Sequence, residues 1–367
     1  MATPRCGGTM GRLTRAEMQE RNRAKVLTAA RDEFVERGFR DAKIDNIAER
    51  AELTRGAVYS NFPGKRALYF AVLAADAERV SEPVYRSQGS TPRTALGEFA
   101  RAWLTRLPLA TDSSGAARLG TDLLPEILAD ERTRLPYTQL VHLDAILLGL
   151  ALERLHRAGT PAPRRVRVAE TTLTTLHGAS QLAAAAPGFV EPFTVVSACE
   201  QFADLAPDDT WDAPHLTQVP PPRTVDEPWA PPVAVDALRD APARLTGDGV
   251  VAVLGLHRIS AIEEAVRAAP PDAEVTAVLV SGTPDELMAL ARLTVAEFRA
   301  CLSQSFPSSS WPRLQVVHDQ DGTLAAAAGV PAVSDATETA VAVHAGRIVA
   351  RAEGWGACHA AASSRRR

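Results

Sequence analysis

Apolar residues recur at helical spacing in three short segments between residues 21 and 75, and a fourth such segment begins at about Lys65. The first segment ends at Gly38, a residue that favours the left-handed backbone of a helix C-cap, and Thr54 precedes the third segment as an N-cap. One face of each segment is apolar, which predicts three packed helices. The expected inward residues are, in chain order, Leu27, Ala30, Phe34, Ile44, Ile47, Ala48, Ala57, Val58 and Phe62.

The outward face of the third segment carries small, hydroxylic, amide and cationic side chains, which are the types that contact phosphates and base edges. Two short helices joined by a tight turn and braced by a longer helix form a helix-turn-helix, whose second helix enters the major groove. We therefore expect Arg55 to read guanine, and Tyr59 and Lys65 to bind phosphates. The alternative is the solvated face of a small helical domain. The outward residues are Arg55, Gly56, Tyr59, Ser60 and Asn61.

The phrase IAERAELTRGAVYSNFPGKRALY resembles the TetR family of bacterial transcriptional regulators across the turn, the recognition helix and the start of the next helix. Two positions depart from the family pattern. Glu52 stands where Gly is usual, which predicts mild strain if its φ is positive. Lys43 stands where Thr is frequent, and it offers a phosphate a cation in place of a hydroxyl. The implied DNA-binding residues are Lys43, Thr54, Arg55, Gly56, Tyr59, Ser60, Asn61 and Lys65.

Changes in composition divide the chain into six regions. The first is a polar arm, expected to be mobile, in which Arg12 and Arg15 either touch DNA or are solvated. Five helical segments follow the head, separated by stretches rich in Gly, Pro and Ser, and a proline-rich connector precedes the last domain. The predicted regions are the arm at 1–20, a helix-turn-helix head at 21–75, a helical domain at 76–206, the connector at 207–235, an α/β domain at 236–356 and a tail at 357–367.

The resemblance implies that the helical domain is an all-α TetR-type regulatory domain that binds an effector and dimerises. Its last two helical segments are rich in Ala, Leu, Thr and Val. We expect these two segments to form a four-helix dimer interface, and the alternative is that they are the domain's own core. Four side chains place polar groups within apolar helical stretches, and each is either a ligand contact or an ordinary core or surface residue: Trp103, His142, Asp144 and His177.

After the connector, short buried strands alternate with helical segments and end in a strand pair, which predicts an α/β sheet of mixed, partly parallel order. The phrases VVHDQDGTLAAAAGV and AVAVHAGRIVARAEGW resemble the second half of thioredoxin-like proteins of the peroxiredoxin and thiol-disulfide oxidoreductase type. In that fold a reactive cysteine begins the helix after the first strand. Here the stretch GLHRISAIEE contains no cysteine, so we expect a catalytically inactive domain. His257 and Arg258 either bind a small anion at this corner or belong to a solvated loop.

Charge and cysteine content narrow the class of protein. Residues 1–75 contain 14 Lys and Arg against 9 Asp and Glu, a net charge of +5, which leaves −9 on the remainder of a chain whose total is −4. A basic head on an acidic body is typical of a protein that places one end on a polyanion. The four cysteines are scattered without metal-ligand spacing, which predicts neither a zinc site nor a disulfide scaffold. Cys199, Cys301 and Cys358 are either inert thiols or redox sensors.

The apolar runs are too short for a membrane span or a signal peptide, so we expect a cytoplasmic protein. Together these features predict a non-enzymatic homodimeric regulator, most often a repressor in this family. It would bind a palindromic double-stranded operator and an unidentified small-molecule effector, without a cofactor or metal. The α/β domain would be an interaction or accessory sensing module. The rival hypothesis is a thiol oxidoreductase or peroxidase that carries a DNA-binding head, and the missing cysteine argues against it.

Overall fold

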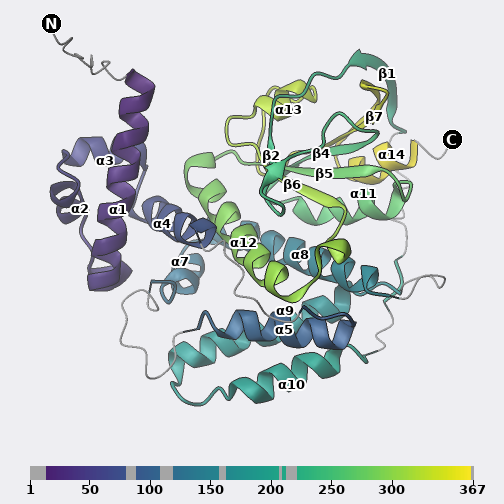
Figure 1. The fold of residues 1–367 in the computed structure, drawn as a ribbon. Helices are drawn as coiled ribbons and strands as arrows, with labels where there is room; N and C mark the ends of the chain where they lie inside the picture. The colour runs from purple at the N-terminus through teal and green to yellow at the C-terminus, as the bar shows by residue number, and fades with distance from the viewer. Residues whose placement is uncertain are drawn as a thin grey trace, which may run out of the picture.

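The structure is a computed structural model that describes residues 14–79, 88–107, 119–156, 163–205, 209–211 and 221–364. Figure 1 shows a helical head on one side, a layered helical body, and a sheet with its own helices. One continuous apolar core runs from the head through the body to one face of the sheet. The three parts are therefore joined by packing as well as by the chain.

The head consists of three helices that surround a small apolar centre. A capping box formed by Thr14 and Glu17 starts the first helix, so residues 15–20 are helical where the sequence predicted a mobile arm. Residues 1–13, with Arg12, lie outside the described residues. The helices of the head are α1 (Arg15–Asp41), α2 (Ile44–Arg50) and α3 (Arg55–Asn61).

Most of the predicted inward residues of the head are buried, including Phe34, Ile47, Val58 and Phe62. Leu27, Ile44 and Ala57 are half-buried. Gly38 interrupts α1 with a φ of 74° and a ψ of 170°, which matches the predicted end of the first helix, although the chain then resumes a short helical turn.

The body is built from six described helices. The predicted helical segment LLPEILADERTR is divided between two of them, because Asp130 is extended (φ −130°, ψ 123°) and caps the second through the N–H of Arg132. The second of these, α8, is long and apolar enough to span a bilayer, but most of it is buried inside the body. The helices are α4 (Lys65–Arg79), α5 (Pro92–Leu104), α7 (Leu123–Ala129), α8 (Glu131–Arg154), α9 (Val166–Ala185) and α10 (Pro192–Phe202).

The predicted α/β sheet of mixed order is present, with six strands in the order β1-β8-β7-β4-β5-β6. The strands β4, β5 and β6 are parallel, whereas β7 is antiparallel to β4, and β8 is antiparallel to both β7 and β1. The strands are β1 (Arg223–Pro228), β4 (Gly249–Gly255), β5 (Glu274–Val280), β6 (Leu314–His318), β7 (Glu338–His344) and β8 (Arg347–Glu353), and a separate pair is formed by β2 (Val235–Asp236) and β3 (Ala241–Pro242).

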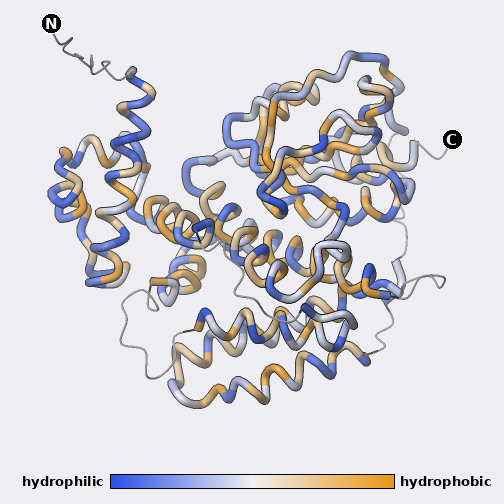
Figure 2. The backbone as a smooth tube through the Cα atoms, in the orientation of Figure 1, coloured by the Kyte–Doolittle hydropathy of each residue, from blue (hydrophilic) through white to orange (hydrophobic). Residues whose placement is uncertain are grey.

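Alternate residues of the central strand face two different apolar cores, as the pleat of a strand requires. Val250, Ala252 and Leu254 belong to the core shared with the helical body, whereas Val251 and Val253 belong to a second core. Figure 2 shows hydrophobic strands within a more polar rim of loops. The helices of this region are α11 (Ile262–Ala268), α12 (Pro284–Ser305), α13 (Thr323–Ala327) and α14 (Ala357–Ser363).

Two stretches differ from the predicted connector and tail. Part of the connector forms the edge strand β1, and Trp229 beyond it is buried and donates its Nε1–H to the carbonyl of Leu245 at 2.7 Å. Part of the tail forms α14, which packs on β7, β8 and α11. The physical reason is burial, since Ala357, Cys358 and Ala361 are fully enclosed and fill the core on that face of the sheet.

The helix α12 follows strand β5 in sequence but packs within the helical body, against α4, α5 and α8. Every residue of α4 from Ala67 to Ala74 is buried, whereas a helix at the surface buries only one stripe. The contact of α4 with α12 is more extensive than its contact with α1. The α/β region therefore supplies part of the packing that encloses the helix leading out of the head.

Candidate nucleic-acid interface

Glu33, a fully buried carboxylate on α1, fixes the position of α2. One carboxylate oxygen accepts a hydrogen bond from Asn46 Nδ2 at 2.8 Å, and the two oxygens lie 3.1 Å from Arg37 Nε and 3.2 Å from Arg50 Nε. A buried charge must be paired, and these partners tie both halves of α2 to α1. Sequence reasoning missed Glu33, because it searched the inward faces for apolar residues only.

The polar face of α3 is accessible. Thr54 Oγ1 accepts a hydrogen bond from the N–H of Ala57 at 3.1 Å, so the predicted N-cap is present. Arg55 and Tyr59 are both exposed and lie one turn apart, with the guanidinium carbon 5.6 Å from the ring centroid. Arg55 Nη1 is also 3.3 Å from a carboxylate oxygen of Asp45 on α2. Such an exposed pair contributes at most about 1 kcal/mol, so a nucleic acid can displace Asp45.

The two ends of the polar face differ. Gly56 is exposed, and a Cβ there would meet only the Thr54 hydroxyl at ordinary contact distance, so the surface above the helix start is open. Ser60 is exposed and donates its hydroxyl to the carbonyl of Ala57 at 2.9 Å. Asn61 is half-buried, its Nδ2 donates to the same carbonyl, and its buried Oδ1 has no partner among the described residues. The structure thus groups Arg55, Gly56, Tyr59 and Ser60 on the exposed surface, whereas the amide of half-buried Asn61 is bound within α3.

The two lysines expected at phosphates have different surroundings. Lys43 is exposed at the N-cap of α2, where its side chain makes no cap hydrogen bond. Lys65 begins α4, but its Nζ donates to the carbonyl of Arg40 at 3.0 Å and lies 4.6 Å from the ring centroid of Phe39. Burial lowers the pKa of this ammonium group. In this structure Lys65 therefore ties α4 to the end of α1, and a phosphate contact would require its side chain to turn outward.

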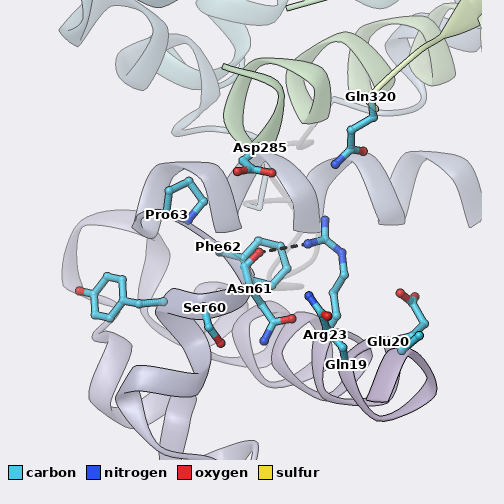
Figure 3. A pocket seen from close by; sticks show the side chains of 11 residues that line it. Gln19, Glu20, Arg23, Ser60, Asn61, Phe62, Pro63, Asp285 and Gln320 are labelled. Atoms are coloured by element: carbon cyan, nitrogen blue, oxygen red, sulfur yellow. Dashed lines mark hydrogen bonds between the residues drawn. The ribbon is translucent and has the colours of Figure 1, made fainter. Parts of the chain in front are cut away.

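Arg23 on α1 is a residue that the sequence analysis did not single out. Its Nη1 donates to the carbonyl of Asn61 at 3.1 Å, and its guanidinium lies 4.4 Å from the ring centroid of Phe62. Figure 3 shows this contact at the edge of a cavity of about 400 Å³ that separates the head from Asp285 and Gln320 of the α/β region. The C-terminal end of α3 therefore faces the rest of the protein across polar side chains.

The turn between α2 and α3 contains the predicted strained residue. Glu52 has a φ of 57°, so a side chain occupies the left-handed conformation for which glycine is favoured. Lys25 Nζ lies 3.4 Å from its carboxylate, which is an exposed pair of little energetic value. Glu52 thus meets the condition under which the sequence predicted mild strain, a positive φ.

The four predicted effector contacts do not form one group. The rings of Trp103 and His177 meet edge to face, with centroids 4.9 Å apart, and Trp103 Nε1 donates to Ser180 at 2.9 Å. Asp144 is buried in the same helical body, with one carboxylate oxygen unpartnered among the described residues. His142 is half-buried, and its Nδ1 lies 3.8 Å from a carboxylate oxygen of Glu170, whose side chain is partly exposed, so it stands apart from the other three residues.

Burial determines the protonation states of the interior residues of this group. It lowers the pKa of His177 to about 4, and it raises the pKa of Asp144 well above the ordinary range of a carboxyl. His177 is therefore neutral near pH 7, and burial favours the protonated form of Asp144. These two buried polar groups, among aromatic and aliphatic side chains, are the feature on which an effector hypothesis depends.

An ion pair occupies the corner after strand β4, where the thioredoxin-like resemblance places a reactive cysteine. Arg258 binds the buried carboxylate of Glu338, with Nε 2.9 Å from one oxygen, and the N–H of Gly356 donates to the other at 2.8 Å. The indole of Trp355 covers the guanidinium at 3.9 Å. Because Arg258 is engaged in this way, the expectation of an anion site or a solvated loop at this residue was wrong.

The three described thiols, Cys199, Cys301 and Cys358, are all buried. Burial raises the pKa of Cys199 to about 12 and raises that of the other two above the ordinary value. Cys358 lies in the predicted tail, but it belongs to α14 and is fully buried. Buried, protonated thiols react poorly, which favours inert cysteines.

Comparison with known proteins identifies the head. Residues 26–72 match the model described as "Bacterial regulatory proteins, tetR family". HTH-type transcriptional regulator SrpR of Pseudomonas putida is 48% identical over 65 residues, which are 18% of this chain and 30% of that protein. Uncharacterized HTH-type transcriptional regulator TtgW, also of Pseudomonas putida, is 48% identical over 65 residues, or 18% of this chain and 48% of that protein. The chain thus spans less than half the length of either relative.

Two solved structures are similar over about half of the chain. A TetR transcriptional regulator from Rhodococcus sp. RHA1 is 20% identical, with a TM-score of 0.32, over 51% of this chain and 95% of that one. NalD, named as the secondary repressor of the MexAB-OprM multidrug efflux pump in Pseudomonas aeruginosa, is 20% identical, with a TM-score of 0.33, over 50% and 95%. On the family match and the two relatives, the head of the present chain is a helix-turn-helix domain of the TetR family.

Proposed function

We propose that this protein is a DNA-binding transcriptional regulator, most simply a repressor, that binds a palindromic operator as a homodimer in the cytoplasm. The observation that carries the proposal is the exposed face of α3, with Arg55 and Tyr59 outermost, in a head that matches the TetR family. Arg can bind guanine through two hydrogen bonds, and Tyr can position the head on a phosphate. Lys43, Thr54, Gly56, Ser60, Asn61 and Lys65 complete the proposed contact set.

Exposed apolar side chains support a homodimer. Phe189 and Phe193, at the connection between α9 and α10, are 71% and 82% exposed, and Leu182 on α9 is 44% exposed. Aromatic residues exposed together at a helix pair are typical of an interface that a second subunit covers. A symmetric dimer built on α9 and α10 would place two heads at successive major grooves, about 34–36 Å apart.

The proposed effector site lies in the helical body near Trp103, His177 and Asp144. Neutral polar groups next to aromatic rings can bind an uncharged or weakly polar small molecule. Such a molecule changes DNA affinity only if it binds the two arrangements of the heads with different affinity. No cofactor is part of the proposal.

We interpret the sheet as thioredoxin-like but not catalytic. Two parallel strand–helix units followed by an antiparallel strand pair and a terminal helix support the fold assignment. The filled corner at Arg258 and the buried thiols argue against the rival hypothesis of a thiol oxidoreductase, because a reactive sulfur must be accessible and ionised. An assay of peroxide turnover distinguishes the two, since the regulator is expected to show none.

The direct test is selection of bound sequences from random double-stranded DNA by the purified full-length protein. We expect enriched sites with two inverted half-sites, whose spacing corresponds to one helical turn. Enrichment of asymmetric sites would contradict the dimer, and no enrichment at low salt would contradict DNA recognition itself. Sedimentation of the protein with the selected duplex then gives the stoichiometry.

A further inference from the structure

The first half of α12 carries charged residues that match charged residues at both ends of α4. Near the start of α4, Arg66 binds Glu286 of α12 and also lies 2.7 Å from Asp130, the N-cap of α8. At the far end of α4, Glu78 accepts two hydrogen bonds from Arg292 of α12, at 2.8 and 2.6 Å. The two helices thus have an ion pair at each end of their contact, and they run in the same general direction.

The middle of this contact is apolar, and its side chains lie out of water. Phe70 and Leu68 of α4 are fully buried, and so is Leu290 of α12, which lies between Glu286 and Arg292 in the sequence. Apolar burial is strong but has little directional preference, so it holds two helices together without fixing how one is turned against the other. An ion pair in which a guanidinium makes two hydrogen bonds fixes the orientation of one helix against the other, particularly where the groups are partly removed from water. Arg66 and Glu286 are 20% and 23% exposed.

The other contact between the head and α12 is polar and contains a cavity. Figure 3 shows Asp285 at the start of α12 across this space from Arg23 and the end of α3, with Gln320 beside it. The charge of Asp285 acts favourably on Arg23, whereas that of Arg292 acts unfavourably. The head is therefore bordered by an apolar contact between α4 and α12 on one side and by a polar cavity on the other.

We propose that α12 is a clamp on α4: the α/β domain sets the orientation of the DNA-binding head through the pairs Arg66–Glu286 and Glu78–Arg292, and release of either pair weakens operator binding. The physical reason is preorganisation. Two heads bind a palindrome at fixed spacing, so freedom of each head in the unbound protein must be lost on binding. The inference rests on the proposed function, and it assigns the α/β domain a direct part in operator affinity.

The test uses full-length protein and the duplex obtained by selection. We compare wild type with Glu286→Gln and Arg292→Gln, and with the control Arg347→Gln, which removes an exposed pair with Asp226 at the far edge of the sheet. Operator affinity is measured by fluorescence anisotropy, and amide hydrogen exchange is followed over residues 65–79. The expected result is at least about five-fold weaker binding for each clamp variant, the lower end of typical coupling between sites, and an unchanged control.

A charge swap separates clamping from general damage to the fold. Arg292→Glu places two carboxylates together at Glu78 and should weaken binding further, whereas the double variant Glu78→Arg with Arg292→Glu should regain most of the wild-type affinity. Wild-type affinity, or tighter binding, in the clamp variants while exchange over α4 is faster would overturn the clamp. If wild type itself selects no DNA, the proposed function fails and not the clamp alone.

Discussion

Two arginines at the beginnings of helices in this molecule, Arg55 and Arg258, have opposite surroundings. At the start of α3, Thr54 caps the helix and Arg55 stands exposed beside Tyr59, with only an exposed partner in Asp45. At the start of the helical turn after β4, Arg258 is bound by a carboxylate that is 1% exposed and is covered by an indole ring. The first arginine can change partners at small cost, and the second cannot.

This contrast indicates where function can be sought. An exposed cation on a rigid helix keeps its hydrogen-bonding capacity for a partner outside the protein. A guanidinium whose N–H groups are bound to a buried carboxylate contributes to the fold and has little capacity left for an outside partner. Arg55 and Arg258 are the same type of residue, and their different surroundings give them different roles.

The largest test removes the α/β domain. If it were an accessory module, a chain that ends at residue 206 would remain folded and bind the operator. We expect instead that it aggregates, because loss of α12 exposes one side of α4, whose residues from Ala67 to Ala74 are now buried. Apolar burial contributes about 25 cal/mol per Å², so exposing several large side chains costs several kcal/mol, comparable to the whole stability of a domain. Size-exclusion chromatography of the soluble fraction measures the outcome, and a monodisperse, DNA-binding fragment would refute it.

Arg258→Met is expected to lower the free energy of unfolding by about 3 kcal/mol, because it leaves the Glu338 carboxylate buried without its cation. The matched control is Arg55→Met, which removes a cation that has only an exposed partner. Urea unfolding followed by circular dichroism measures both. Equal stability of the two variants would remove the basis of the comparison between the two helix starts.

The stability of the protein should also depend on pH through Glu264, whose carboxyl is influenced by the charges of Glu338 and Arg258. Burial, then the charge of Glu338, raises the pKa of Glu264 to about 7 from its ordinary 4.5. The pKa of Glu264 is higher in the folded than in the unfolded protein. Its contribution to the free energy of unfolding is therefore complete below pH 4.5 and is lost as pH rises through about 7. The slope cannot exceed about 1.4 kcal/mol per pH unit for one proton. Urea unfolding at pH 5 and pH 7 should show this loss in wild type and a smaller one in Glu264→Gln, and equal slopes would exclude Glu264 as its source.

These cases show what a sequence can and cannot predict. Most helices and strands followed from spacing, whereas β1 and α14 formed where a connector and a tail were predicted, and the exposed face of α3 followed from the apolar positions that oppose it. The ion pairs that determine the surroundings of these arginines join residues that are far apart in the sequence: Arg66 with Glu286, and Arg258 with Glu338. No local pattern reveals such a pair, nor that α12 leaves its own sheet to pack on α4. For the same reason no local pattern revealed that the ammonium group of Lys65 donates to the carbonyl of Arg40 at the end of α1.

At the head, Arg55→Ala and Tyr59→Ala should each weaken operator binding about ten-fold, since one good contact to a base or phosphate is worth about 1–3 kcal/mol. The melting temperature should stay unchanged, because both side chains are exposed. Arg55→Ala should also relax sequence preference at one base pair, whereas Tyr59→Ala should weaken all sequences alike. Gel-shift titration with the selected site and single-base variants of it provides the measurement. Unaltered affinity in both variants would contradict the assignment of α3.

The smallest expected effect concerns the turn that precedes α3. Glu52 holds a φ of 57°, which costs a side-chain-bearing residue about 1–2 kcal/mol, and glycine would relieve that strain but lose about 0.5–1 kcal/mol to backbone entropy. Glu52→Gly should therefore raise the free energy of unfolding by less than about 1 kcal/mol. Glu52→Ala is the control, because it removes the exposed contact with Lys25 and keeps the strained backbone. If glycine destabilised the head more than alanine does, the strain at this turn would be smaller than the backbone entropy that glycine loses on folding.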